Sequence, residues 1–187
     1  MNKLIYILVI ILACVSCNGG KTKTDALKTS VEKFKDSIGT LEIEKYIPEA
    51  YSETITDTIL SNGFKVKIKT FTDMEHSVLN MFKQDTIVYK HYYRDAIAEI
   101  TVFKNDIQIV SQKIDKSLFL KRDNELKDYF EIANLSGVWL NENESLDKDK
   151  ISIFIMFCKP ETDYYYLNEM IVDGNGEVFI HEVTEKT

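Results

Sequence analysis

An acidic loop near the C-terminus is the part of the chain best suited to binding a metal. Asp173, Asn175 and Glu177 alternate with two glycines, and oxygen ligands at alternate positions suit calcium. The loop ends after five residues and lacks the distal bidentate glutamate of calcium-binding loops. Its composition is also typical of a β-turn. We therefore predict a hairpin turn and keep the three residues as secondary metal candidates, which Glu161 and Asp163 could join only in three dimensions.

The sequence carries few signs of catalysis. It contains no G-x-S-x-G elbow, no H-E-x-x-H pair, and no glycine loop for nucleotide phosphates. The histidines His76, His91 and His181 are scattered, and His91 shares a predicted strand face with tyrosines. These features favour a protein that is not an enzyme and has no cofactor. The alternative is a hydrolase or metal-dependent enzyme that uses dispersed aspartate, glutamate and histidine.

Tyrosine is abundant, with ten residues that include runs at 92–93 and 164–166. Aromatic side chains on sheet faces stack against sugar rings, and tyrosine is enriched at protein interfaces. Cross-strand packing with the hydroxyls in water also explains such runs. The tyrosine runs therefore indicate either a surface that binds a protein or a glycan, or ordinary cross-strand packing, and both interpretations stay open.

The charge of the chain argues against nucleic acid. The 187 residues carry a formal charge of −7. Removing the first sixteen residues deletes Lys3 and no acid, which leaves 22 − 30 = −8. An acidic surface repels phosphate backbones and anionic headgroups. The length allows one domain in addition to a leader and a tether.

The N-terminus has the pattern of a signal peptide. Lys3 precedes an uninterrupted apolar run, Leu4–Ala13. A membrane-spanning helix needs about twenty apolar residues, and this run is much shorter. A basic start, a short apolar run and small residues after it predict a secretory leader over residues 1–16.

The leader ends on Ala13-Cys14-Val15-Ser16-Cys17, which resembles the lipobox of bacterial lipoproteins. The resemblance implies that the cysteine after a small residue is acylated and becomes the first mature residue. Cys17 follows Ser16 and precedes two glycines, so we expect lipidation there, with Cys14 as the alternative. Residues 17–24 are then the lipidated cysteine and its tether. Cys158 remains the one other thiol, and its apolar run predicts a buried, inert side chain.

Residues 25–50 are predicted to form a helix and a linker. Leu27, Val31, Phe34 and Ile38 fall at helical spacing, with Thr24 or Asp25 as the N-cap and Gly39 as the terminator.

The remainder, residues 51–187, is predicted to be a β-rich domain. Apolar and lysine residues alternate over 64–69, and Asn62-Gly63 indicates a two-residue hairpin turn with Ile59 opposite Val66. Short links and the absence of alternating helices favour an antiparallel β-sandwich or a barrel-like meander. One or two helical turns are expected near 126–133. The other predicted strands are Glu53–Leu60, Thr86–Tyr93, Ala96–Phe103, Ile107–Ile114, Gly137–Leu140, Ile151–Cys158, Tyr165–Val172 and Val178–Val183, with Arg94-Asp95 and Lys104–Asp106 as turns.

Several strand and turn segments resemble small uncharacterised lipoproteins of Gram-negative gut anaerobes. The resemblance covers roughly residues 50–185 and includes Tyr93-Arg94-Asp95, Phe103–Asp106, Ile114–Phe119 and Lys159–Asp163. It implies a shared fold and location, and it carries no activity. Three Asp-Ser/Thr-apolar tripeptides also resemble the periplasmic O-glycosylation acceptor of these bacteria, which makes Ser37, Thr58 and Thr86 candidate sites.

Together these features predict a lipid-anchored cell-envelope protein that acts as a binding or interaction module. An envelope enzyme and a structural tether without a ligand are the alternatives. Because Asn18–Lys23 contains no acid, the resemblance implies the outer membrane with the domain facing the periplasm. The cell surface is the alternative location.

Overall fold

The computed structural model describes residues 22–145 and 149–183, except the side chain of Ile38. The chain divides into two compact units, Met1–Leu41 and Glu42–Thr187.

In its described residues, the first unit contains the helix α2 (Lys23–Ile38). Thr22 caps it, because its hydroxyl accepts a hydrogen bond from the Asp25 amide at 3.2 Å. The cap predicted at Thr24 or Asp25 is therefore wrong by two or three residues. Gly39 follows the helix with φ of 69°, as expected for a terminator.

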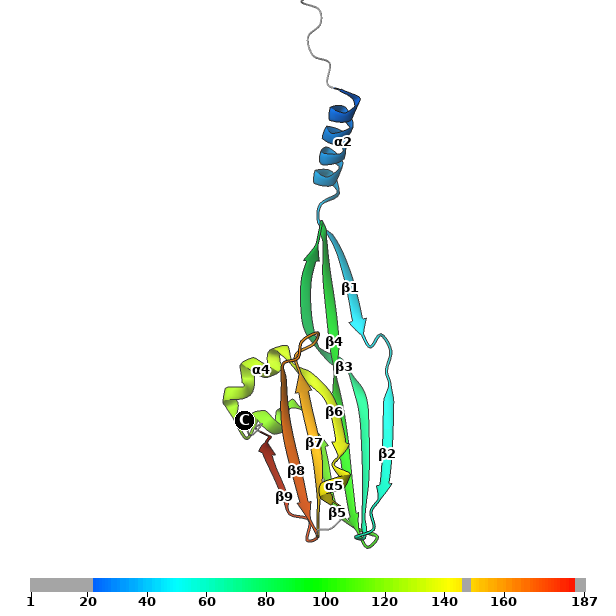
Figure 1. The fold of residues 1–187 in the computed structure, drawn as a ribbon, viewed down its shortest axis with the longest axis vertical. Coiled ribbons are helices and arrows are strands. Elements are labelled where there is room, and N and C mark those ends of the chain that lie inside the picture. Colours follow the sequence, from blue (N-terminus) through cyan, green and yellow to red (C-terminus); the bar gives the residue numbers. More distant parts are fainter. Residues whose placement is uncertain (1–21, 146–148, 184–187) are drawn as a thin grey trace, which may run out of the picture. The chain divides into compact units, whose positions relative to one another are not determined.

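The second unit is mainly β and is a sandwich of two sheets, as the sequence predicted (Figure 1). In the larger sheet the strand order is β1-β4-β3-β2, and β5 also pairs with β4; in the smaller sheet it is β6-β7-β8-β9. Neither sheet closes into a barrel. The strands are β1 (Leu41–Ile47), β2 (Glu53–Ile59), β3 (Phe64–Gln84), β4 (Ile87–Lys104), β5 (Ile107–Ile114), β6 (Asn134–Leu140), β7 (Lys150–Cys158), β8 (Tyr165–Asp173) and β9 (Val178–Glu182).

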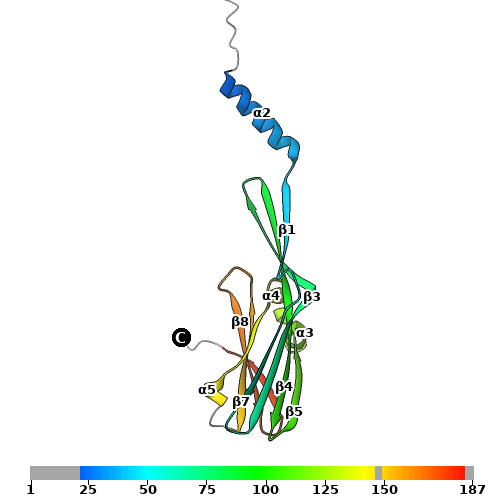
Figure 2. The same ribbon diagram turned by 90° about the vertical axis from the view of Figure 1, so that its right-hand side faces the viewer.

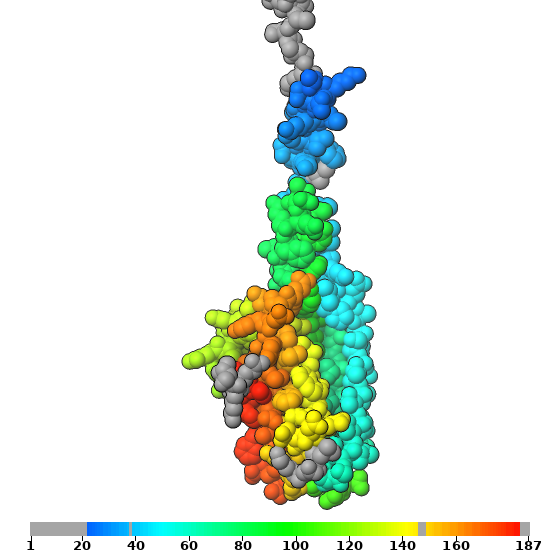
Figure 3. All heavy atoms as spheres, viewed as in Figure 1, coloured from blue at the N-terminus to red at the C-terminus, as the bar shows by residue number. Residues whose placement is uncertain are grey.

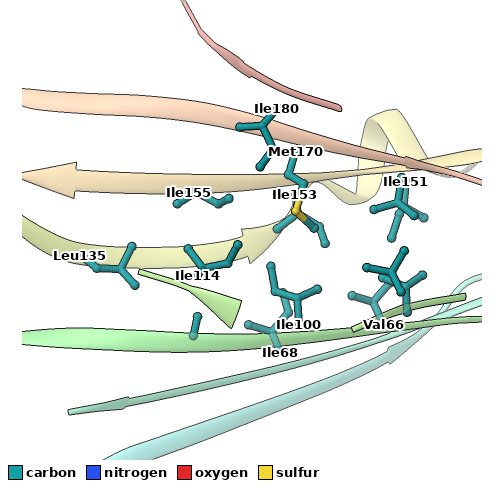
Figure 4. Close-up of a cluster of buried hydrophobic side chains, with 14 of the residues drawn as sticks. Val66, Ile68, Ile100, Ile114, Leu135, Ile151, Ile153, Ile155, Met170 and Ile180 are labelled. Atoms are coloured by element: carbon teal, nitrogen blue, oxygen red, sulfur yellow. The ribbon is translucent and has the colours of Figure 1, made fainter. Parts of the chain in front are cut away.

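The core lies between the two sheets (Figure 4). Alternate residues of β3, β4 and β7 point inward, as the period of a half-buried strand requires. From the larger sheet come Val66, Ile68, Ile100 and Ile114; from the smaller sheet come Leu135, Ile151, Ile153, Ile155 and Met170. The alternation that predicted these strands is therefore the pattern that builds the core.

Short helical segments connect some of the strands: three of them lie between β5 of the larger sheet and β6 of the smaller one, and the last lies between β6 and β7. They are α3 (Lys116–Leu120), η1 (Asn124–Leu126), α4 (Lys127–Ile132) and α5 (Glu142–Ser145). The segments η1 and α4 confirm the helical turns predicted near 126–133, whereas α3 and α5 were not predicted. Across 22–145 and 149–183, every helix is too short or too polar to cross a membrane.

Two strands differ from the prediction. β1 lies in the segment expected to be a linker. Its contacts with β4 indicate that the two strands run in the same direction, since Glu42 and Glu44 contact Lys90 and Tyr46, further along β1, contacts Tyr92. β4 is continuous, so no turn exists at Arg94-Asp95.

The predicted turn becomes a break in strand register. The ladder between β3 and β4 is interrupted between Thr72 and Ser77, where four residues of β3 stand opposite the single residue Asp95 of β4. Such insertions increase strand twist, and the two strands cross near this break (Figure 2).

The turn at Asn62-Gly63 exists, but its geometry differs from the prediction. Leu60 and Phe64 close a three-residue loop, and only Gly63 has a positive φ, at 85°. This is a type I turn followed by a left-handed residue. Val66 consequently pairs with Thr58, not with Ile59.

We predict that Gly63→Val destabilises the domain by about 1–3 kcal/mol, because a β-branched residue is strained at positive φ. A Cβ atom at Gly63 would also lie 2.6 Å from Oδ1 of Asn105. Ser61→Val, at an exposed position of the same turn, should change stability by less than about 0.5 kcal/mol. Urea unfolding measures the stability of both variants, and equal unfolding midpoints for the two would contradict this turn geometry.

Candidate functional site in the projecting ribbon

Beyond the register break, β3 and β4 leave the sandwich core. We call residues Ser77–Gln84 of β3, Ile87–Arg94 of β4 and the neighbouring strand β1 the projecting ribbon. Figures 1 and 3 show it extending past the end of the smaller sheet. Among its residues only Val78 is a buried apolar side chain. The ribbon is therefore held together by backbone pairing and by contacts between side chains on its faces.

One face of the ribbon is aromatic. Register pairs place Phe82 opposite Tyr89 and Asn80 opposite His91. The rings of Phe82 and Tyr89 are stacked with centroids 5.1 Å apart, and His91 meets Phe82 edge-on at 5.1 Å. Tyr93 continues the row at 6.3 Å from His91. We call Phe82, Tyr89, His91 and Tyr93 the aromatic face. It confirms that His91 shares a strand face with these tyrosines.

Glu161, in the loop between β7 and β8, bonds to this face. Its carboxylate accepts a short hydrogen bond from the Tyr93 hydroxyl and one from Nδ2 of Asn80 at 2.8 Å, and Nδ1 of His91 lies 3.4 Å away. The tyrosine bond lowers the pKa of Glu161. Burial and the same bond raise the pKa of Tyr93 to about 12. These contacts fix the loop against the ribbon.

The opposite face combines charge with aromatic stacking. Tyr46 of β1 stacks on Tyr92 with centroids 4.8 Å apart, and the Arg94 guanidinium lies 4.5 Å from the Tyr46 ring centre. Lys90 bonds to Glu42 at 2.5 Å. These contacts attach β1 to β4, so β1 forms one edge of the ribbon.

The other edge of the ribbon, along β3, is open. β2 pairs with β3 only as far as Phe71, and no described strand pairs with Ser77–Gln84 on that side. The hairpin closes at Gln84 and Ile87, so Gln84 and every second residue before it bond to β4. The intervening residues point their backbone N–H and C=O groups outward. Two of them, Leu79 and Met81, have apolar side chains that are 48% and 61% exposed.

A cavity of about 620 Å³ lies beside the register break. Asp95 and Lys116 in its wall form an ion pair at 2.7 Å. Asp73 accepts hydrogen bonds from the amides of Glu75 and His76. The carboxylates of Asp95 and Asp73 are thus already engaged by protein groups.

The acidic loop is a turn, as predicted. Oδ1 of Asp173 accepts hydrogen bonds from the amides of Asn175 and Glu177, both at 2.9 Å, and these bonds lower the pKa of Asp173. Asp173 and Glu161 flank opposite ends of β8, so the convergence considered for them does not occur. In the part of the chain that the structure describes, no three His, Cys, Asp or Glu side chains are grouped to hold a metal.

The candidate modification sites differ in accessibility. Ser37 is exposed in the last turn of α2, and Thr86 is exposed in the turn at the tip of the ribbon. Thr58 is half-buried in β2. Cys158 is also half-buried, which corrects the buried thiol expected from sequence, and it accepts a hydrogen bond from Ser136 at 3.1 Å. Cys17 and Cys14 lie outside the described residues.

Comparison with known proteins leaves the site to be judged on its own geometry. No protein-family model matches the chain, and no curated protein matches it.

The other two histidines lie outside the aromatic face and pair with acids, His76 with Asp73 at 2.8 Å and His181 with Glu169 at 3.2 Å. Sequence inspection missed the open edge of β3, because Thr70–Gln84 has no regular alternation of apolar and polar residues.

We predict that Glu161→Gln lowers the pKa of Tyr93, which stays above its ordinary value because burial, the largest single cause of the rise, remains. A raised tyrosine pKa means that this contact contributes stability below pH 10 and loses it as the pH rises through about 12. Ultraviolet titration of tyrosinate, with the Tyr93→Phe curve subtracted, measures the shift. Asp163→Asn in the same loop is the control. A Tyr93 titration that Glu161→Gln leaves unchanged would show that this bond does not form in solution.

Proposed function

We propose that this chain is a lipid-anchored cell-envelope protein whose β-domain binds an extended segment of a partner protein along the open edge of β3. The observation that carries the proposal is the edge itself. Ser77, Leu79, Met81 and Lys83 present unpaired backbone groups in a row, next to exposed apolar side chains. Such an edge is a template for pairing with another chain.

The composition of the edge supports a partner. Soluble proteins usually protect an open edge with several charges, a proline or a covering loop. From Ser77 to Gln84 this edge has one charged residue, Lys83, and no proline. A strand added to it would form backbone hydrogen bonds and would pack beside Leu79 and Met81. This pairing would remove an aggregation hazard from the free protein.

The same contacts favour a protein over a glycan as partner. A sugar would need free polar groups beside the aromatic face to bond its hydroxyls. Asn80, His91 and Tyr93 instead direct polar atoms toward Glu161. The aromatic face then serves as a rigid support for the edge, and a glycan becomes an outcome of the test below.

The lipobox-like ending at Cys17 supports the anchor, and the tether supports the location. The acid-free sequence from Asn18 to Lys23 favours the periplasmic side of the outer membrane, in line with the resemblance to small lipoproteins.

We expect Cys17→Ala to abolish acylation and to release the protein from the outer-membrane fraction. Cys14→Ala, the matched control, should leave acylation intact. Protease should degrade the wild-type protein only after the outer membrane is permeabilised. Palmitate labelling of the Cys17→Ala chain would place the lipid on the other cysteine, and degradation in intact cells would place the domain on the surface.

We expect Met81→Pro to abolish partner capture while the domain stays folded. The Met81 N–H points away from β4, so proline there removes a donor from the edge and leaves the β3–β4 ladder intact. Crosslinking in intact cells followed by pull-down measures the capture. Met81→Ala, which shortens the side chain and keeps the N–H, should retain much more partner than Met81→Pro.

Two substitutions of Phe82 complete the test. Phe82→Pro checks which backbone N–H groups bond to β4, and Phe82→Ala checks whether the partner binds the aromatic face. Phe82→Pro should destabilise the domain by about 1 kcal/mol or more, because its N–H bonds to β4. Partner capture that survives Met81→Pro but is lost with Phe82→Ala would move the site to the aromatic face, where a glycan or a protein could bind. Absence of any reproducible partner would favour the structural tether, and a small-molecule turnover product would favour the enzyme.

A further inference from the structure

The helix α2 has an apolar stripe along one side. Leu27, Val31 and Phe34 recur at i, i+4 and i+7, which places them on one face of a helix. Leu27 and Phe34 are 65% and 64% exposed. A single helix cannot bury such a stripe by itself, so the stripe requires a covering surface or costs free energy in water.

Charges are arranged asymmetrically around this stripe. At 3.6 residues per turn, Lys28 and Lys35 lie on one flank of it, whereas Asp25 and Asp36 lie on the opposite side. Glu32 and Lys33 lie between these positions, one on each side of the helix. Lysines that border an apolar stripe can extend their ammonium groups to lipid phosphates while their methylene stems stay in the apolar boundary. Acids on the far side stay in water. This arrangement matches a helix that lies in the plane of a membrane surface.

The position of α2 in the chain brings it to such a surface. Five residues separate Cys17 from Lys23, so the helix starts at most about 20 Å from the anchored cysteine. The helix spans sixteen residues, or about 24 Å. A lipid at Cys17 would therefore keep the start of the helix close to the leaflet and would let the whole stripe reach it.

We propose that α2 lies on the membrane leaflet that holds the anchor, with Leu27, Val31 and Phe34 inserted among the lipids. This inference rests on the proposed lipid anchor. The competing occupant is a second copy of the helix, because the spacing of the stripe also matches a coiled-coil seam. Coiled coils are recognised by seams sustained over three or four heptads, and α2 provides about two, which favours the membrane.

The test uses the full lipidated chain in vesicles that contain brominated phosphatidylglycerol. Trp139, the only tryptophan, is replaced by phenylalanine, and a new tryptophan is placed by Phe34→Trp or, as the matched control, by Glu32→Trp. We expect severalfold stronger quenching and a blue-shifted emission for Phe34→Trp. Adding Leu27→Gln and Val31→Gln to that chain should reduce its quenching to the level of the control.

The outcomes separate the two proposals. Mass spectrometry of the purified protein reports acylation of Cys17, and an unmodified cysteine would contradict the anchor. Equal quenching of the acylated Phe34→Trp and Glu32→Trp proteins would overturn the helix proposal and leave the anchor proposal intact. Blue-shifted emission without quenching, rising with protein density in the vesicles, would assign the stripe to a second copy of α2.

Discussion

The buried carboxylate of Asp95 determines where β3 and β4 change from core strands into an open ribbon. It accepts hydrogen bonds from the amides of Ala96 at 3.0 Å and Leu135 at 2.9 Å, and it pairs with Lys116 at 2.7 Å. One side chain thus connects the larger sheet, the smaller sheet and α3. Leaving a buried charge without its partner costs about 3–5 kcal/mol, so the register break is held firmly in place.

Different forces hold the two sides of this break together. Below it, Val66, Ile100 and Ile153 are fully or almost fully buried, and apolar burial supplies most of the stabilisation. In the projecting ribbon, on the other side of the break, ring stacking and charged contacts replace a core. Glu161 there fixes the β7–β8 loop against the aromatic face. The ribbon therefore keeps a defined shape while it leaves the edge of β3 open.

This division also explains which elements could be predicted from sequence. Strands that bury one face alternate clearly, as Phe64–Lys69 and Ile107–Ile114 do, and they were predicted. Strand β1 and Thr70–Gln84 were missed, because strands exposed on both faces need no alternation. The register of β2 was wrong by one residue because the Gly63 turn holds three residues, and loop length depends on backbone angles that the dipeptide alone does not specify. The open edge is a property of pairing, which no local pattern encodes.

The chain passes from α2 into the β-domain within a few residues. Gly39 and Thr40 alone separate α2 from β1, and β1 enters the β-domain beside Lys90, near the tip of the ribbon. If α2 lies in the leaflet, the chain leaves the lipid surface only a few residues before it joins the ribbon.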